Sequence, residues 1–306
     1  MKPKILVLYY TQTGQLKQIL DSMLSGIAQL AEIDYCEIKP VNPFPFPWQS
    51  ATFFDCMPES VQQISEPIEP LHIPNKSYDL VILGYQPWFL SPSIPFNSFL
   101  RSSQADFLKG KKVITVIGSR NMWLNAQESV KKLLIGLKAE LVGNIVFFDR
   151  NPNLTSVLTI IRWTFTGRKE ATKRMPEAGV QQKDIDAGSR FGPILFDALQ
   201  QGRLNELHTT LLSANAVEMS PALVILEKRA ITNFRKFSLF ILEKGKRGDP
   251  ARKGRVNLFK RLLFVGVFIL SPLSSLTAGI AVFLKKRSLD EAVQYFKNIR
   301  YKENAL

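Results

Sequence analysis

The amino-acid sequence predicts an α/β fold, a doubly wound parallel sheet of five strands followed by a mainly helical region. Three observations predict it. Short uninterrupted apolar runs recur along the first half of the chain, helical patterns separate them, and the strand pattern stops after residue 149. Apolar runs without alternation are typical of strands that are covered on both faces. Strands that alternate with helices indicate a parallel sheet.

Five apolar runs mark the expected strands. They cover residues 5–10, 33–38, 78–84, 112–118 and 144–148. Apolar residues recur at helical spacing over residues 17–31, and a second helical pattern covers residues 127–137. Helices with one apolar face are the elements that cover a sheet.

Two stretches depart from this alternation. Residues 41–76 form an insert rich in proline and aromatic residues, and proline blocks regular helix because it lacks a backbone N–H. After residue 149 the chain is mainly helical in pattern. We therefore expect a sheet domain over residues 1–150, which carries the insert, and a helical C-terminal region over residues 151–306.

The composition excludes several classes of function. The chain has 40 Lys and Arg against 26 Asp and Glu, a net charge of +14 that favours an anionic partner. Two cysteines and two histidines are too few for a disulfide framework or a Cys/His metal site, so no metal is expected. The basic clusters flank apolar segments, and no nucleic-acid-binding motif is recognisable, so nucleic acid is not an expected partner.

The turn after the first apolar run has the residues of a phosphate-binding loop. Thr11, Gln12, Thr13, Gly14 and Gln15 lie between the first strand and the first helix. The free N–H groups of a helix N-terminus bind phosphate, threonine hydroxyls add donors, and glycine permits close approach. A Thr-capped turn without a ligand has the same residues, so this segment alone leaves both interpretations open. The G-x-G-x-x-G pattern of dinucleotide sites does not follow the first strand.

Two further loops share the same edge of the sheet, because the carboxyl ends of parallel strands meet there. The chain runs GYQPWFLSP from Gly84 and GSRNMW from Gly118. Each loop combines glycine with a large aromatic residue, as stacking on a planar ligand requires. The candidate ligand-binding residues in these loops are Gln86, Pro87, Trp88, Phe89, Gly118, Ser119, Arg120, Asn121 and Trp123.

Together the three loops resemble those of the flavodoxin family, over about residues 1–150. The first loop matches the T/S-x-T-G-x-T phosphate loop of that family except at Leu16, where a hydroxyl residue is usual. The resemblance implies that the cofactor is FMN. It also implies that the first loop holds the phosphate and that residues 118–123 form the third contact. Trp88 is the best match for the aromatic residue against the isoalloxazine ring, with Tyr85 or Phe89 as alternatives.

A narrower resemblance covers most of the chain. The segments YYTQTGQLKQIL, PFPFPW, LGYQPWFLSPSIPF, VIGSRNMWLNAQE and DRNPNLTSVLTIIRW resemble the dialkylresorcinol condensing enzymes, which accompany a ketosynthase-type partner. The resemblance implies that the partner makes a dialkylcyclohexane-1,3-dione and that this protein, as an FMN-dependent aromatase, oxidises it to a dialkylresorcinol. Two alternatives stay open: a flavodoxin-like quinone or NAD(P)H oxidoreductase with another substrate, and a flavin-free scaffold that recruits the ketosynthase to the membrane.

Aromatisation of a cyclic dione removes a hydride and a proton, so polar groups are expected near the reacting atoms. The candidates for catalysis are Tyr85, Arg120 and Asn121. A cation at Arg120 suits an enolate or a negatively charged flavin, although a surface ion pair uses the same residue type. The expected lining of an apolar pocket over the flavin is Trp48, Trp88 and Trp123.

One segment of the helical region has the pattern of a membrane-associating element. Residues 262–284 contain no charged residue, are long enough to cross a bilayer as a helix, and have basic residues at both ends. Ser271 and Pro272 interrupt the segment near its middle. The symmetric charge favours a hairpin that dips into one face, although a buried helix pair has the same pattern. Because residues 5–8 are too short for a signal-peptide core, we expect the cytoplasmic side of the inner membrane, with anionic lipid as a partner.

Overall fold

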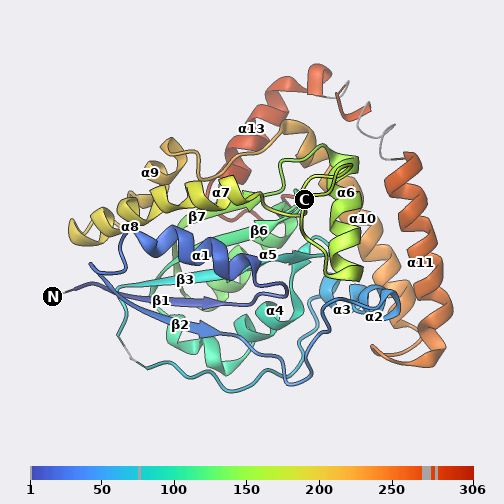
Figure 1. The fold of residues 1–306 in the computed structure, drawn as a ribbon, viewed down its shortest axis with the longest axis horizontal. Helices are drawn as coiled ribbons and strands as arrows, with labels where there is room; N and C mark the ends of the chain where they lie inside the picture. Colours follow the sequence, from blue (N-terminus) through green and yellow to red (C-terminus); the bar gives the residue numbers. More distant parts are fainter. Residues whose placement is uncertain (1, 75–76, 271–276, 280–281) are drawn as a thin grey trace.

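The computed structural model describes residues 2–74, 77–270, 277–279 and 282–306 (Figure 1). Its centre is a five-stranded parallel sheet in the order β2-β1-β3-β6-β7. The strands are β1 (Lys4–Tyr9), β2 (Glu32–Glu37), β3 (Leu80–Tyr85), β6 (Lys112–Ser119) and β7 (Glu140–Phe148). Counted among themselves, the five strands have the order 2-1-3-4-5 of a flavodoxin-like, doubly wound fold. The predicted fold class and all five predicted strands are confirmed.

The strands differ in burial according to their place in the sheet. Every residue of β3 is buried, and so are five of the six residues of β1, because each has a strand on either side and helices on both faces. In β2, at the edge, Cys36 is the buried residue. The strand β7 begins at Glu140, four residues before the predicted start. The prediction starts late because Glu140 and Gly143 interrupt the apolar pattern in this part of the sequence.

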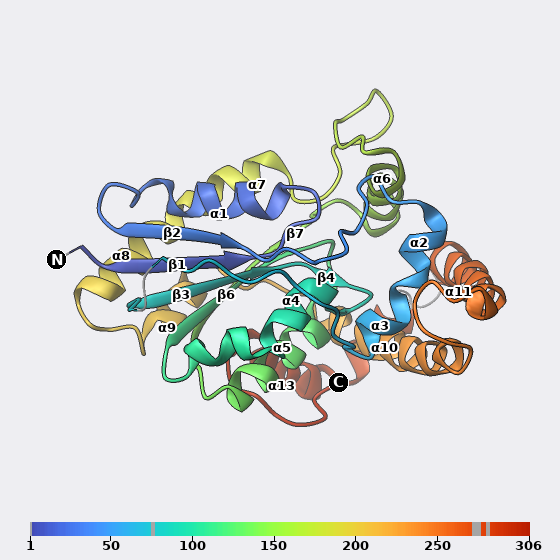
Figure 2. The ribbon, with the colours of Figure 1, turned by 90° about the horizontal axis from the view of Figure 1, so that it is seen from below.

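The helices of both halves of the chain cover the two faces of this one sheet (Figure 2). Helices from the second half of the chain pack on both faces, together with helices from the first half. The first face has α1 (Gln15–Ser25), α7 (Gln182–Asp186), α8 (Phe191–Gln200) and α9 (Leu207–Ser213). The second face has α4 (Ile94–Leu100), α5 (Leu124–Gly136) and α13 (Lys286–Lys297). The helical C-terminal region is therefore part of the cover of the sheet.

A further layer stands beyond the carboxyl ends of the strands (Figures 1 and 2). It consists of α2 (Ser50–Asp55), α3 (Met57–Val61), α6 (Asn153–Thr166), α10 (Pro221–Leu242) and α11 (Lys253–Val265), with a π-helical turn over Gly266–Leu270. The insert at residues 41–76 therefore contains two short helices where irregular structure is predicted. Pro58 is accepted at the start of α3, where the missing N–H has no partner in any helix. The described residues also contain 3-10 turns, namely η1 (Ser103–Leu108), η2 (Ala187–Arg190) and η3 (Pro250–Arg252).

Two arginines from the connection between α10 and α11 fasten this outer layer to the insert. Arg252 is fully buried, and its guanidinium donates to both carboxylate oxygens of Glu59 (2.6 and 2.9 Å). Arg247 pairs in the same two-bond manner with Glu66 (2.7 and 2.5 Å). Two-bond arginine–carboxylate pairs fix direction as well as distance, so the position of α11 is set by the insert.

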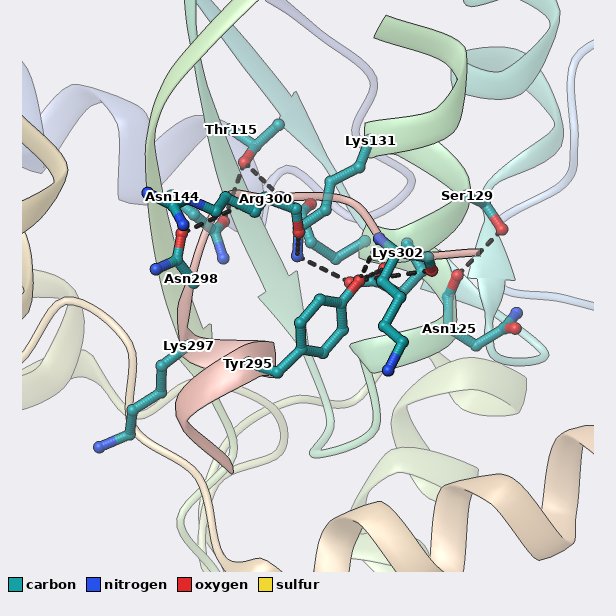
Figure 3. Close-up of polar contacts among 12 residues, drawn as sticks. Thr115, Asn125, Ser129, Lys131, Asn144, Tyr295, Lys297, Asn298, Arg300 and Lys302 are labelled. Carbon is teal, nitrogen blue, oxygen red and sulfur yellow. Dashed lines mark hydrogen bonds and ion pairs between the residues drawn. The ribbon is translucent and has the colours of Figure 1, made fainter. Parts of the chain in front are cut away.

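The last helix is fastened to the sheet layer by a buried lysine. Lys131 of α5 donates to Glu128 (2.7 Å) and to the backbone oxygen of Arg300 (3.1 Å). The Tyr295 hydroxyl of α13 donates to the other oxygen of Glu128 (2.5 Å), so one carboxylate joins the two helices. Figure 3 shows Tyr295 and Arg300 converging on Lys131 from the C-terminal segment.

The predicted membrane-associating segment, residues 262–284, lies partly outside the described residues, and so does its predicted break at Ser271 and Pro272. Its first part continues α11 to Val265 and forms the π-helical turn. In the part of the chain that the structure describes, no helix combines the length and the apolar character needed to cross a membrane.

The buried ion pair gives the first prediction. Replacing Lys131 by Met leaves Glu128 buried without its countercharge, which lowers the free energy of unfolding by about 3 kcal/mol. Urea unfolding measures this change. Lys132→Met is the matched control, because the Lys132 side chain is exposed, and it changes the free energy by less than about 0.5 kcal/mol. Equal effects of the two substitutions would contradict the role given to Lys131.

Candidate functional site

A cleft opens at the carboxyl edge of the sheet, where the loops after β1, β3 and β6 meet. It holds about 910 Å³ of empty space, including the part that is open to solvent. This is the place where open α/β sheets bind ligands. The insert and α6 form its remaining walls. The lining residues are Gln12, Thr13, Gln15, Leu16, Ile19, Phe46, Trp48, Phe53, Gln86, Pro87, Trp88, Phe89, Gly118, Ser119, Arg120, Ile160, Trp163, Thr164 and Gly179.

The loop after β1 forms one end of the cleft. Gly14 has φ of +80° and directly precedes the first residue of α1. This left-handed backbone conformation is one that glycine adopts without strain. The Thr11 hydroxyl accepts from the Gly14 N–H (3.1 Å), and the Thr13 hydroxyl accepts from the Gln15 N–H (3.4 Å). The N–H groups of the first helical turn have no partner within the helix and carry the positive end of its dipole. This end of the cleft suits an anion.

Arg120 adds a full positive charge to the cleft. It donates to the neutral side-chain oxygen of Asn153 (2.8 Å), and none of the ion pairs among the described residues includes it. Burial lowers the pKa of the Arg120 guanidinium to about 10, although the charge of Asp149 opposes this effect. The neighbouring Ser119 hydroxyl is buried and has no hydrogen-bond partner in the described part of the chain. A half-buried cation beside a buried hydroxyl without a partner is suited to bind an anionic or strongly accepting group.

Aromatic side chains form the opposite wall. The ring of Trp88 makes edge-to-face contacts with Phe44 and Trp48, with ring centroids 5.0 and 5.4 Å apart. Trp48 in turn contacts Phe53 at 5.5 Å. When the Gln86 amide is oriented with its oxygen toward Trp88, it accepts from the indole N–H (3.1 Å). The short ladder of β4 (Pro87–Trp88) and β5 (Ser91–Pro92) sets the position of Trp88 within its loop.

The C-terminal region closes the cleft beside the phosphate-type loop. The Gln15 side chain donates to the Val180 carbonyl (2.9 Å) and accepts from the Val180 N–H (3.1 Å). Gly179 has φ of +77°, and a Cβ there would lie 2.6 Å from the Gln15 side-chain oxygen and 2.7 Å from the Trp163 ring. The two halves of the chain therefore meet at this point with no room for a larger residue.

Most of the residues predicted from the three loops come together. The cleft brings Gln12, Thr13, Gln15, Gln86, Pro87, Trp88, Phe89, Gly118, Ser119 and Arg120 to its walls. Thr11 and Gly14 shape the first loop without lining the cleft. Asn121 stands beside Arg120, and its side chain donates to the same oxygen of Asn153 (3.3 Å).

Two predicted site residues lie elsewhere, and both predictions are corrected. The Tyr85 ring stacks on Phe96 with centroids 4.7 Å apart, and its hydroxyl donates to Gln127 (2.8 Å). Tyr85 is fully buried, and burial raises the pKa of its hydroxyl well above the ordinary value, so the phenol keeps its proton and cannot accept one from a substrate. Trp123 is 1% exposed and packs in the core on the α5 face. Neither residue lines the cleft, because both side chains point to that face of the sheet.

The sequence interpretation misses the wall that comes from α6 and the segment after it. Its residues are Ile160, Trp163, Thr164 and Gly179. An apolar stretch with a tryptophan directly after the last strand is the one local signal for this wall. This local pattern does not predict on which side of the sheet edge the helix lies. Trp48, by contrast, lies in the cleft as predicted, and Phe46 and Phe53 of the same insert join it.

A buried carboxylate ties α10 to the loop that carries Arg120. Glu227 of α10 accepts from the Asn125 N–H (2.7 Å) at the start of α5, and its other oxygen has no partner among the described residues. Burial raises the pKa of Glu227 to about 7, although backbone N–H groups at Asn125, Leu124 and Trp123 oppose the rise. A carboxylate at a helix N-terminus is a favourable cap, so Glu227 fixes the α5 end of this loop.

Glu227 gives a pH prediction. Its pKa is raised in the folded protein, so the folded state holds this proton more tightly than the unfolded state. Stability falls as the pH rises from about 4.5 to about 7, by up to about 3 kcal/mol, and the contribution is constant at higher pH. Replacing Glu227 by Gln removes this part of the pH dependence. Unfolding free energies of the variant and the wild type over this range give the difference, and Asp197→Asn, at an exposed site on α8, serves as the control.

Comparisons with known proteins complete the description of this site. No protein-family model and no curated protein matches the chain. Among solved structures, a flavoprotein of Lactobacillus acidophilus in complex with FMN is 19% identical, covers 47% of this chain and 93% of its own, and has a TM-score of 0.38. A flavodoxin from Archaea is 10% identical, with coverages of 64% and 99% and a TM-score of 0.36.

A flavodoxin described as WrbA-like, from Agrobacterium tumefaciens, is 12% identical, with coverages of 65% and 98% and a TM-score of 0.36. Likeness at these levels says nothing of ligand or reaction. The chemistry of this chain must therefore be argued from its own cleft.

Proposed function

We propose that the cleft binds FMN and that the protein is a flavin-dependent oxidoreductase. One observation carries this proposal: a single cleft joins a helix N-terminus and the half-buried cation Arg120, which is in no salt bridge among the described residues, to a wall of aromatic rings. A mononucleotide with a planar ring system needs both kinds of surface, one for its phosphate and one for its ring. The buried Ser119 hydroxyl, which has no partner among the described residues, supplies a further donor or acceptor for the same ligand.

Each part of the cleft has a separate task in this proposal. The first loop binds the phosphate through N–H groups of α1 and the hydroxyl of Thr13, which turns away from the Gln15 N–H when the phosphate replaces it as acceptor. Trp88 offers a ring face or edge whose position Gln86 holds. Arg120 stabilises negative charge near the reacting atoms, which includes the charge of an enolate. Bound FMN supplies the chemistry of hydride acceptance.

We propose that the substrate is a dialkylcyclohexane-1,3-dione and the product a dialkylresorcinol. The apolar wall of Phe46, Trp48, Phe53 and Ile160 suits alkyl chains. A cyclic 1,3-dione enolises readily, and loss of one hydride and one proton makes its ring aromatic. Because Tyr85 is buried, the proton goes to water, and Arg120 stabilises the negative charge on the enolate oxygen.

A ketosynthase-type enzyme is the proposed source of the dione, and the cytoplasmic side of the inner membrane is the proposed location. The resemblance of the sequence supports the first of these. The net charge of +14 and the apolar character of a dialkylated product support the second.

The role of Arg120 can be measured directly. Replacing it by Gln removes a half-buried positive charge from the cleft, which weakens FMN binding by about tenfold or more. Quenching of flavin fluorescence on binding gives the dissociation constant. Arg203→Gln, at an exposed position, is the matched control and leaves the affinity as it is. An unchanged affinity in the Arg120 variant would remove the arginine from the site.

The proposed reaction has its own test. Purified protein loaded with FMN is mixed with a synthetic 2,5-dialkylcyclohexane-1,3-dione without oxygen. We expect loss of the oxidised flavin absorbance and one resorcinol per flavin, detected by mass spectrometry. Flavin that stays oxidised, in a protein that binds it, would reject the dione as the substrate and favour a quinone or NAD(P)H reaction. A protein that binds no FMN would favour the scaffold function.

A further inference from the structure

The helix α11 is apolar on two sides. Its inner side carries Val256 and Phe259, which pack in the buried cluster with α2, α3 and α10. Its outer side carries Leu258, Leu262 and Val265, and Ile269 follows in the π-helical turn; these four form the outer stripe. They are 44%, 44%, 42% and 61% exposed. Residues three and four apart lie on one side of a helix, so the outer stripe is continuous.

The stripe extends onto the end of α10. Leu239 and Phe240 are also exposed there. Arg255 joins the two helices, because its guanidinium lies over the Phe240 ring at 3.9 Å and donates to the Phe240 carbonyl. Figure 1 shows α11 along the outer border of the molecule, with α10 between it and the sheet. The apolar surface therefore faces away from the rest of the protein.

Positive charge is concentrated in α11 and in the connection that precedes it. Between residues 244 and 261 the chain has eight basic residues and one acid, Asp249. Arg247 and Arg252 are used inside the protein by Glu66 and Glu59. The exposed cations that have no ion pair among the described residues are Lys244, Lys246, Lys253 and Arg261. The exposed apolar residues are complementary to a partner with an apolar interior, and the cations beside them are complementary to an anionic surface.

We infer that the outer stripe and its basic border dock on a bilayer that contains anionic lipid. The stripe enters the boundary between head groups and acyl chains, and the lysines and arginines contact the head groups. A second copy of this chain fits less well, because a symmetric pair through the stripe brings the two basic borders together. Leu258 precedes the predicted membrane-associating segment, and the other three residues of the outer stripe belong to its first part.

Docking would also place the cleft near the lipid. Phe264 of α11 contacts Phe54 with ring centroids 6.1 Å apart, and Phe54 contacts Phe53 at 5.1 Å. Phe53 lines the cleft. The rings of Phe54 and Phe53 thus lie between Phe264 of the docked helix and the cleft. This consequence rests on the proposed function, whereas docking itself does not.

The test uses the full chain and sedimentation with vesicles. We expect binding to vesicles of phosphatidylcholine mixed with phosphatidylglycerol, and little binding to phosphatidylcholine alone. Leu258→Ser with Leu262→Ser weakens the partition coefficient by about tenfold or more, because two leucines no longer enter the bilayer. Arg261→Glu lowers the partition coefficient onto the anionic vesicles by about tenfold, and added salt lowers it as well. The matched controls are Ile135→Ser, exposed on α5, and Lys109→Glu, exposed at the other end of the sheet.

Three outcomes would overturn the inference: no binding of the wild type to either vesicle, equal loss in the control variants, or a dimer in light scattering that Leu258→Ser with Leu262→Ser dissociates. FMN binding measured on the same samples keeps the two proposals apart. Failure to bind vesicles with intact FMN affinity rejects the docking surface alone. Vesicle binding without FMN affinity rejects the flavin site alone.

Discussion

A parallel sheet of apolar strands must be covered on both faces, and the rest of this structure depends on that constraint. The first 150 residues supply α1 on one face and α4 and α5 on the other. The chain between β2 and β3 goes to the insert, so it adds no helix to either face. The cover is completed by α7, α8, α9 and α13, which all come from the second half of the chain. The two halves are therefore one packed body.

The same wrapping builds the site. To reach α7 from β7, the chain passes over the carboxyl edge of the sheet, and there α6 and Gly179 become walls of the cleft. The paired hydrogen bonds between Gln15 and Val180 hold that crossing against the start of α1. A cleft with a cation and a helix N-terminus would fill with water if it lay open. The crossing limits that access and strengthens the electrostatic effect of Arg120.

The insert and the α10–α11 pair depend on each other in a comparable way. Glu59 and Arg252 are both buried, so Glu59 would be an uncompensated charge without Arg252. The insert that supplies Trp48 and Phe53 to the cleft thus also fixes the helix that carries the outer stripe. One unit of structure serves the aromatic wall on its inner side and the basic, apolar surface on its outer side.

The amino-acid sequence was enough to predict the five strands, their parallel arrangement and the three loops at one edge of the sheet, because local patterns mark the strands and parallel strands end at the same edge. It also placed Thr13, Trp88 and Arg120 in those loops. Only the tertiary structure decided that Tyr85 and Trp123 turn into the core, because the direction of a side chain at a strand end depends on which helix packs beside it. It likewise decided that Gly179 meets Gln15, since a contact between residues so far apart leaves no trace in local sequence.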